Sequence, residues 1–282
     1  MKLNSLTSYE HGVGKVDLIP ETGIRMSLPP STSGYSNAQL DDCHTLNRGE
    51  FRWRAPLRMY LRARVSHQAP QGTLGFGFWN DPFTLSLGQR GAGRRFPAPP
   101  QTAWFFYGSK PNNLSFTTGI PGHGWKAMVL RSPQIPSPLL LPAAGLGLAL
   151  SRIPIIRAPI VNTAKASLKT AEAVMDVDLR AWHTYEILWH PSELTFKVDG
   201  EVVLSTEVAP RGPLGFVTWM DNQYAVATGE DGLQFGVLPV GESQWLEAEG
   251  LTIEKLPTDS NSGSLEIRTA KTEEDDFGAS DD

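Results

Sequence analysis

The sequence predicts an all-β protein in which two antiparallel sheets pack face to face. Residues 182–222 alternate apolar and polar side chains and resume this alternation after each group of turn residues, as consecutive antiparallel strands do. The 27 glycines and 22 prolines show no collagen-like period and favour many short strands joined by turns. A chain of 282 residues, 40% of them hydrophobic, can bury a full core. We therefore expect one β-sandwich domain over residues 1–257.

The Asp199-Gly200 pair is the clearest local signal. It separates residues 195–198 from residues 202–204, which are both rich in strand-forming side chains. A two-residue turn with positive φ matches the twist of the strands on either side of it. The pair therefore predicts a hairpin that fixes the register of residues 182–222.

Further runs of alternating, aromatic or β-branched residues predict the other strands. In residues 57–65, Leu57 and Met59 begin an apolar face, and Arg58 and Tyr60 begin a polar one. This pattern is typical of a strand with one face in water. The remaining predicted strands are residues 24–28, 35–40, 74–81, 102–107, 114–117, 125–131, 232–238 and 244–256.

Residues 133–175 interrupt the strand pattern and predict an inserted, mainly apolar helical lobe. A helix is expected over residues 162–174, whose apolar residues recur at helical spacing. Prolines interrupt the uncharged run before it, which disfavours a transmembrane helix. The lobe either packs over a sheet or acts as a lid or interfacial anchor, with peripheral membrane contact through residues 133–160. Residues 258–282 are rich in Ser, Gly, Asp and Glu and predict a disordered acidic tail.

Charge and composition limit the classes of partner. The net charge of −5 and the lack of a Lys/Arg-rich run exclude a basic field for nucleic acid. The single Cys43 forms no internal disulfide, and the first residues contain no apolar signal segment; a cytoplasmic location is therefore expected. Cysteine and histidine spacing suggests no metal site, and no cofactor is expected.

Two predicted strands share one design on the face opposite their apolar residues. Alternate residues of a strand point to the same side, so each strand places small residues beside a tryptophan and an aspartate. Glycine inside a strand is common where a ligand approaches closely, which predicts a floor kept clear for a ligand. The alternative is a bulge or tight packing against protein. The two sets are Gly75, Gly77, Trp79 and Asp81, and Gly215, Val217, Trp219 and Asp221.

The order of three segments resembles a known family. Residues 72–81 (GTLGFGFWND) are followed by residues 182–203 (WHTYEILWHPSELTFKVDGEVV) and 244–256 (QWLEAEGLTIEKL). This order is similar to the laminarinase-type enzymes of glycoside hydrolase family sixteen, in the concanavalin A-like lectin and glucanase superfamily. The resemblance covers most of residues 23–256 and implies a concanavalin A-like jelly-roll β-sandwich with a concave binding groove.

The family's catalytic motif is absent from the matching strand. The family places Glu-x-Asp-x-(x)-Glu on one strand, because retaining hydrolysis needs two carboxyl groups about 5 Å apart. Residues 102–107 contain no acid. The resemblance therefore implies a glycan-binding fold without the usual chemistry. A relocated catalytic set drawn from Asp81, Glu186 and Asp221 is the alternative.

The resemblance also implies a set of ligand-binding residues. Aromatic rings in such a groove stack on sugar faces, and polar side chains at strand ends bind hydroxyl groups. Burial in the core is the alternative for each ring, and turn capping is the alternative for the polar residues. We expect a glycan or polyhydroxylated ligand; the second hypothesis is a lipid or apolar small molecule gated by residues 133–175. The predicted residues are Trp79, Asp81, Trp104, Tyr107, Trp219, Asp221, Asn222 and Tyr224.

Overall fold

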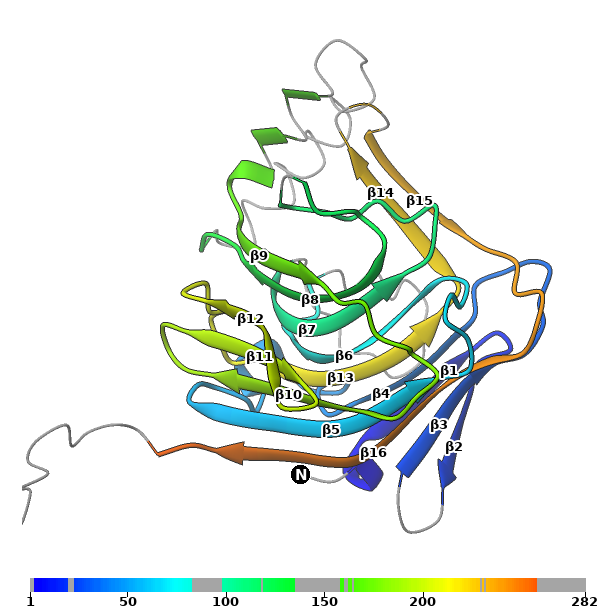
Figure 1. Cartoon of the computed structure of the whole chain (residues 1–282), viewed down its shortest axis with the longest axis horizontal. Helices are drawn as coiled ribbons and strands as arrows, with labels where there is room; N and C mark the ends of the chain where they lie inside the picture. Colours follow the sequence, from blue (N-terminus) through cyan, green and yellow to red (C-terminus); the bar gives the residue numbers. More distant parts are fainter. Residues whose placement is uncertain are drawn as a thin grey trace, which may run out of the picture.

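The computed structural model confirms a sandwich of two large antiparallel sheets (Figure 1). It describes residues 3–19, 23–82, 98–117, 119–134, 158–159, 162–163, 165–228, 230 and 232–257. The first sheet has the strand order β1-β4-β13-β6-β7-β8-β9, and the second has the order β12-β11-β10-β5-β16-β3-β2. Strands β14 and β15 form a separate two-stranded ribbon that projects from the sandwich in Figure 1.

Most strands match the predicted runs, but residues 7–11, 15–19 and 169–174 form strands that the sequence did not predict. The first sheet contains β1 (Thr7–His11), β4 (Asn37–Asp41), β6 (Thr73–Trp79), β7 (Gln101–Gly108), β8 (Gly124–Arg131), β9 (Lys169–Val174) and β13 (Gly215–Asp221). The second contains β2 (Lys15–Ile19), β3 (Gly23–Leu28), β5 (Leu57–Val65), β10 (His183–Trp189), β11 (Leu194–Val198), β12 (Glu201–Thr206) and β16 (Gln244–Lys255). The ribbon consists of β14 (Gln223–Thr228) and β15 (Gly232–Val237), and the 3₁₀-helices are η1 (Leu3–Ser5) and η2 (Arg48–Glu50).

The core lies between the two sheets and is rich in aromatic rings. Phe76 of β6 meets Tyr185 of β10 with ring centroids 5.0 Å apart, and Phe105 of β7 meets Phe196 of β11 at 5.2 Å. All four side chains are almost completely buried. Burial of apolar area stabilises the fold by roughly 25 cal/mol per Å², so these rings join the two layers.

The exposed face of the second sheet confirms the predicted wet face of β5. Arg64 lies 4.8 Å from the ring centroid of Trp182 and 5.4 Å from that of Trp245. The Glu247 carboxylate pairs with both Arg64 and Arg25. On this face, arginine side chains therefore pair with carboxylates and stack on tryptophan rings.

The predicted hairpin at Asp199-Gly200 is confirmed. Strands β11 and β12 pair across it, with φ of 51° at Asp199 and 87° at Gly200. Both values lie in the left-handed region that a type I′ turn requires.

Two predicted elements are wrong. Residues 162–163 and 165–166 are helical, but Lys169–Val174 is strand β9, paired with β8. Its Ala, Lys and Glu residues favour helix, and tertiary pairing overrides that weak preference. Residues 114–117 form no strand, because the backbone N–H groups of Phe116 and Thr117 donate to the Glu172 carboxylate.

Most of the predicted lobe, residues 135–157, and the predicted tail, residues 258–282, lie outside the described residues. Within the described part of the chain, no helix has the length and apolar character needed to cross a membrane.

The turn provides a test of the hairpin. An added methyl group at Gly200 meets no atom within 4 Å, so Gly200→Ala tests only the cost of positive φ, which is about 1–2 kcal/mol for an L-residue. We expect that loss in the free energy of unfolding, measured with urea. Gly241→Ala is the matched control, since Gly241 is equally uncrowded and has no positive φ. An equal effect of both substitutions would contradict the turn geometry.

Candidate functional site

The outer face of the first sheet carries a continuous group of aromatic rings. Strand pairing places Trp219 opposite Gly75, Trp79 opposite Gly215 and Trp104 opposite Gly77, all facing away from the core. The ring centroids of Trp104 and Trp219 are 5.2 Å apart, and those of Trp79 and Trp104 are 6.2 Å apart. We call this group the outer aromatic cluster; its members are Trp79, Trp104, Phe106, Leu114, Phe116, Met128, Leu130, Val217 and Trp219.

The glycines beside these rings are filled by protein, so the prediction of a clear glycine floor is wrong. A Cβ atom at Gly75 would lie 2.9 Å from Cη2 of Trp219, and one at Gly77 would lie 2.8 Å from Cβ of Trp104. At Gly215 the added atom would collide with the Cys43 side chain. The alternative of tight packing holds: the missing side chains let the indole rings lie close to the sheet.

Asp221 is tied to the cluster by a short hydrogen-bond chain. The indole N–H of Trp219 donates to Oγ1 of Thr73 (3.0 Å), whose hydroxyl donates to Oδ1 of Asp221 (2.8 Å). The backbone N–H of Gln223 donates to the same oxygen at 3.0 Å. Burial raises the pKa of Asp221 to about 6, and these hydrogen bonds oppose the rise. Burial raises the pKa of Tyr35, and the negative charge of Asp221 raises it further.

A polar corner adjoins Asp221, and sequence reasoning missed it. Gln39 donates to the Asp41 carboxylate at 2.8 Å, and both side chains share the outer face with Trp219 through the register of β4 and β13. Tyr9 of β1 stacks on His44 with centroids 5.4 Å apart. The strand β1 is largely polar and exposed, so its only signal was alternation over five residues.

The three candidate catalytic carboxylates are not brought together, and the prediction of a relocated set is wrong. Glu186 lies on the outer face of the second sheet, paired with Arg58 at 2.8 Å, so the whole core separates it from Asp221. Asp221 pairs with Thr73 at the start of β6, whereas Asp81 follows the other end of that strand. At about 3.3 Å per residue, β6 from Thr73 to Trp79 spans roughly 20 Å, and Asp81 lies two residues beyond it.

Asp81 adopts a φ of 45° in the turn after β6, and its carbonyl oxygen accepts a hydrogen bond from Arg48. This geometry fits the turn alternative.

Three other predicted ligand residues lie elsewhere than expected. Tyr107 belongs to the core between the sheets, so its placement beside Trp104 on the outer face is wrong. Asn222 is fully buried; its Oδ1 accepts from Ser36 N at 2.8 Å, and its Nδ2 donates to two backbone carbonyls. Its amide therefore has a structural role. Tyr224 lies on β14, with its ring against Gly236 of β15.

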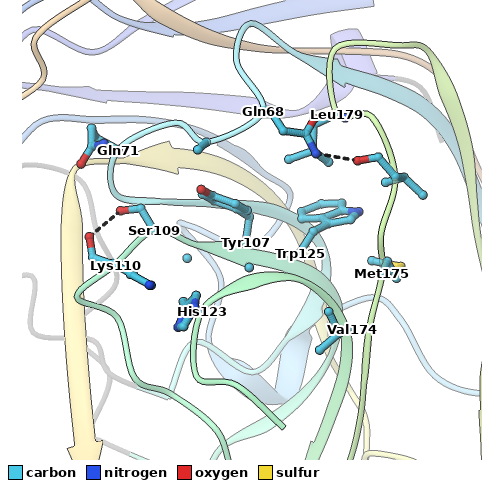
Figure 2. A pocket seen from close by; sticks show the side chains of 14 residues that line it. Gln68, Gln71, Tyr107, Ser109, Lys110, His123, Trp125, Val174, Met175 and Leu179 are labelled. Atoms are coloured by element: carbon cyan, nitrogen blue, oxygen red, sulfur yellow. Dashed lines mark hydrogen bonds between the residues drawn. The ribbon is translucent and has the colours of Figure 1, made fainter.

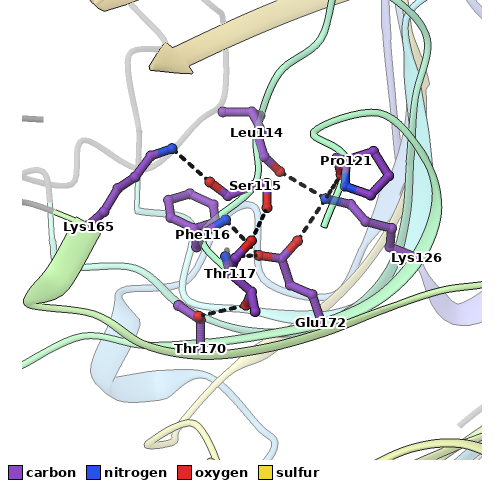
Figure 3. A network of polar contacts seen from close by, with 9 residues as sticks. All are labelled: Leu114, Ser115, Phe116, Thr117, Pro121, Lys126, Lys165, Thr170 and Glu172. Atoms are coloured by element: carbon purple, nitrogen blue, oxygen red, sulfur yellow. Dashed lines mark hydrogen bonds and ion pairs between the residues drawn. The ribbon is translucent and has the colours of Figure 1, made fainter. Parts of the chain in front are cut away.

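A buried ion pair anchors a loop beside the cluster (Figure 3). Nζ of Lys126 lies 2.8 Å from Oε2 of Glu172, and neither side chain has exposed area. The same ammonium donates to the carbonyls of Leu114 (2.9 Å) and Pro121 (3.2 Å). Oε1 of Glu172 accepts from the backbone N–H of Phe116 at 2.6 Å. The pair therefore holds residues 114–121 on the outer face.

Sequence reasoning missed this pair. Its signal was one charged residue inside each of two otherwise apolar or small-residue runs, WKAMVLR and TAEAV. Across the described ranges, no group of three or more His, Cys, Asp or Glu side chains is arranged to hold a metal ion.

The raised pKa of Asp221 predicts a pH effect on stability. The ordinary value is 3.8 and the folded value is about 6, so the folded chain binds this proton more tightly than the unfolded chain. The stability that this tighter proton binding contributes to the folded protein is complete below about pH 4, and it is lost as pH rises through about 6. A shift of about two units corresponds to about 3 kcal/mol.

Asp221→Asn tests this linkage, because an amide oxygen still accepts both hydrogen bonds made to Oδ1. We expect urea unfolding of the variant to lack the loss of about 3 kcal/mol between about pH 4 and pH 7. Identical pH profiles in both proteins would contradict the assignment.

The buried pair gives a second stability prediction. Glu172→Gln keeps an acceptor for the loop N–H groups but leaves the ammonium of Lys126 buried without a counter-charge, which costs about 3–5 kcal/mol. Urea unfolding measures this loss. The matched control is Asp178→Asn, which breaks the exposed pair of Asp178 and Arg180 and should leave stability unchanged. Similar effects of the two substitutions would show that burial does not set the cost.

One protein-family model matches part of the chain. The model of Glycosyl hydrolases family 16 matches residues 164–214, a segment that contains β9 to β12. A comparison with curated proteins found no significant match.

Among solved structures, endo-β-1,4-glucuronan lyase from Trichoderma reesei is 13% identical, with 90% of this chain and 93% of that chain covered and a TM-score of 0.46. The legume lectin-like domain from Entamoeba histolytica is 10% identical, with 89% and 90% covered and a TM-score of 0.47. The Bacteroides ovatus mixed linkage glucan GH16 protein, in complex with its G4G4G3G product, is 10% identical, with 88% and 94% covered and a TM-score of 0.46. The predicted resemblance to glycoside hydrolase family sixteen is confirmed by the family model, in residues 164–214.

Proposed function

We propose that this protein binds a glycan, or another polyhydroxylated ligand, on the outer face of its first sheet. The observation that carries the proposal is the contact of Trp79, Trp104 and Trp219 on one face, with neighbouring rings 5.2–6.2 Å apart. Indole rings combine a large apolar surface with one polar N–H group. Such a surface suits the C–H faces and hydroxyl groups of a sugar.

Polar groups next to the rings support the same ligand class. The buried Asp221 carboxylate accepts hydrogen bonds from Thr73 and Gln223, and a carboxylate offers about four acceptor sites in all. The indole N–H groups of Trp79 and Trp104 are buried and donate to none of the residues described. Buried polar groups in native proteins normally have a partner. An acceptor for sugar hydroxyls therefore adjoins the stacking surface, and the two indole N–H groups lie beneath that surface without a partner among the described residues.

We propose binding without the two-carboxylate hydrolysis of the family. The outward side chains of β7 are Thr102, Trp104 and Phe106, and none is an acid. Hydrolysis needs two carboxyl groups about 5–9.5 Å apart. The outer-face carboxylate next along the neighbouring strand is Asp41, which pairs with Val217, roughly 13 Å along β13 from Asp221.

A second candidate is an apolar small molecule or lipid. It is favoured by the apolar neighbours of the rings, since Met128, Leu130 and Val217 offer no polar atom to a sugar. The first candidate is preferred because Asp221 and the polar corner adjoin the same rings.

Glycan-array binding of the full chain, followed by calorimetry with the best ligand, tests the proposal. We expect Trp104→Ala to weaken binding at least tenfold, about 1.4 kcal/mol, because it removes the central ring. Trp182→Ala is the matched control, since Trp182 is also half-buried but lies among the arginines of the second sheet. Thermal unfolding confirms that both variants fold.

The other outcomes are equally informative. Equal loss of glycan binding in both variants would contradict the assigned surface, and no glycan signal together with binding to liposomes would replace the first candidate with the second. Release of new reducing ends from a bound glycan would contradict binding without hydrolysis.

A further inference from the structure

A pocket of about 440 Å³ opens at the end of the sandwich where β7 ends and β8 begins (Figure 2). Its lining comes from the end of β7, the start of β8, residues 109–110 and 123 between them, residues 68–71 and residues 174–179. No member of the outer aromatic cluster lines it. The pocket is therefore separate from the surface assigned to glycan binding.

Lys110 is the one Lys, Arg, Asp or Glu side chain of the lining, and His123 is its one histidine. Lys110 and His123 lie on one side of the pocket in Figure 2, and the lining contains no Asp or Glu. Within the described chain, neither side chain forms an ion pair. The protein as a whole carries a net charge of −5, so a basic, acid-free pocket favours an anionic group.

The opposite side of the pocket is apolar. Figure 2 shows Trp125, Met175 and Val174 across from Lys110, with Tyr107 between the two sides. The Tyr107 ring is 6% exposed. The lining therefore has a polar, basic half and an apolar half, which matches a ligand with a charged head and a flat apolar body.

Hydrogen bonds hold this lining in place. Gln68 donates to the carbonyl of Val177 at 2.8 Å and accepts from the N–H of Leu179 at 2.9 Å. The N–H of Met175 donates to the carbonyl of Trp125 at 2.9 Å. A preformed pocket of this size is within the range of about 300–1,000 Å³ that takes small molecules.

We propose that this pocket binds a small amphipathic organic anion, a carboxylate or phosphate carried on an aromatic or similarly flat apolar body. The anionic group contacts Lys110 and His123, and the body packs on Trp125 and Met175. This activity goes beyond the proposed function, because it uses a different surface and a different ligand class.

Calorimetry and ligand-observed NMR on the full chain test the pocket with three probes of similar shape. Benzoate and phenyl phosphate should bind, and neutral benzyl alcohol should bind at least tenfold more weakly. Comparison of the first two probes distinguishes a carboxylate site from a phosphate site. Lys110→Gln should weaken binding of the preferred anion at least fivefold. The matched control is Lys15→Gln on β2, an exposed lysine outside the lining, which should change nothing.

A second variant keeps the proposal falsifiable. Val174 is 47% exposed at the pocket, so Val174→Trp should fill the space without disturbing the core. We expect this variant to lose anion binding and to keep glycan binding. Equal affinity for benzoate and benzyl alcohol, no binding of either anion to the folded protein, or full binding by Val174→Trp would overturn the proposal. Loss of glycan binding in Trp104→Ala alone would leave the pocket unaffected.

Discussion

The outer face of the first sheet depends on the close approach of the Trp219 ring to Gly75. Any side chain at that position would place its Cβ 2.9 Å from the indole, a distance that real Cβ atoms do not tolerate. At Gly77 a Cβ atom would collide with the backbone of Ala103 and Trp104, so this glycine lets β6 and β7 lie close together. Strand β6 therefore sends phenylalanines such as Phe76 into the core and leaves space on its other face. Because of that space, rings from β7 and β13 meet above β6, and one sheet forms two aromatic layers.

The sequence predicted the two-faced strands because alternation is a local property. The faces of Trp79 and Trp219 and the Asp199-Gly200 turn all follow from spacing within a single run of residues. Alternation also places Tyr107 correctly: it lies three positions after Trp104, so the two side chains point to opposite faces of β7. The wrong placement of Tyr107 could therefore have been avoided from the sequence alone. The role of the glycines could not, because the ring that fills Gly75 comes from a strand far away in the chain.

Contacts with distant parts of the chain also explain why the predicted structure of residues 169–174 and 114–117 was wrong. Lys169–Val174 has a composition that favours helix, and it becomes a strand because the edge of β8 offers it hydrogen-bond partners. Its Glu172 then supplies the acceptor that replaces strand pairing for Phe116. Helix preference amounts to a few tenths of a kcal/mol per residue, whereas an unpaired buried backbone group costs about 1–3 kcal/mol. Long-range satisfaction of polar groups therefore decides the local structure here.

The polar groups of the outer face fall into two classes, and only one of them is suited to bind a ligand. Lys126 and Glu172 pair with each other and with the backbone of Leu114, Phe116 and Pro121. Such groups fix shape, and a ligand contacting them would have to displace existing bonds. Asp221 differs, since its partners Thr73 and Gln223 leave part of the acceptor capacity of a carboxylate unused, while burial raises its pKa to about 6. A group with unused acceptor capacity gains more from a hydroxyl-bearing ligand than a satisfied ion pair does. For this reason the proposed glycan recognition is placed on the β6 and β13 side of the cluster, whereas the β8 and β9 side anchors the loop.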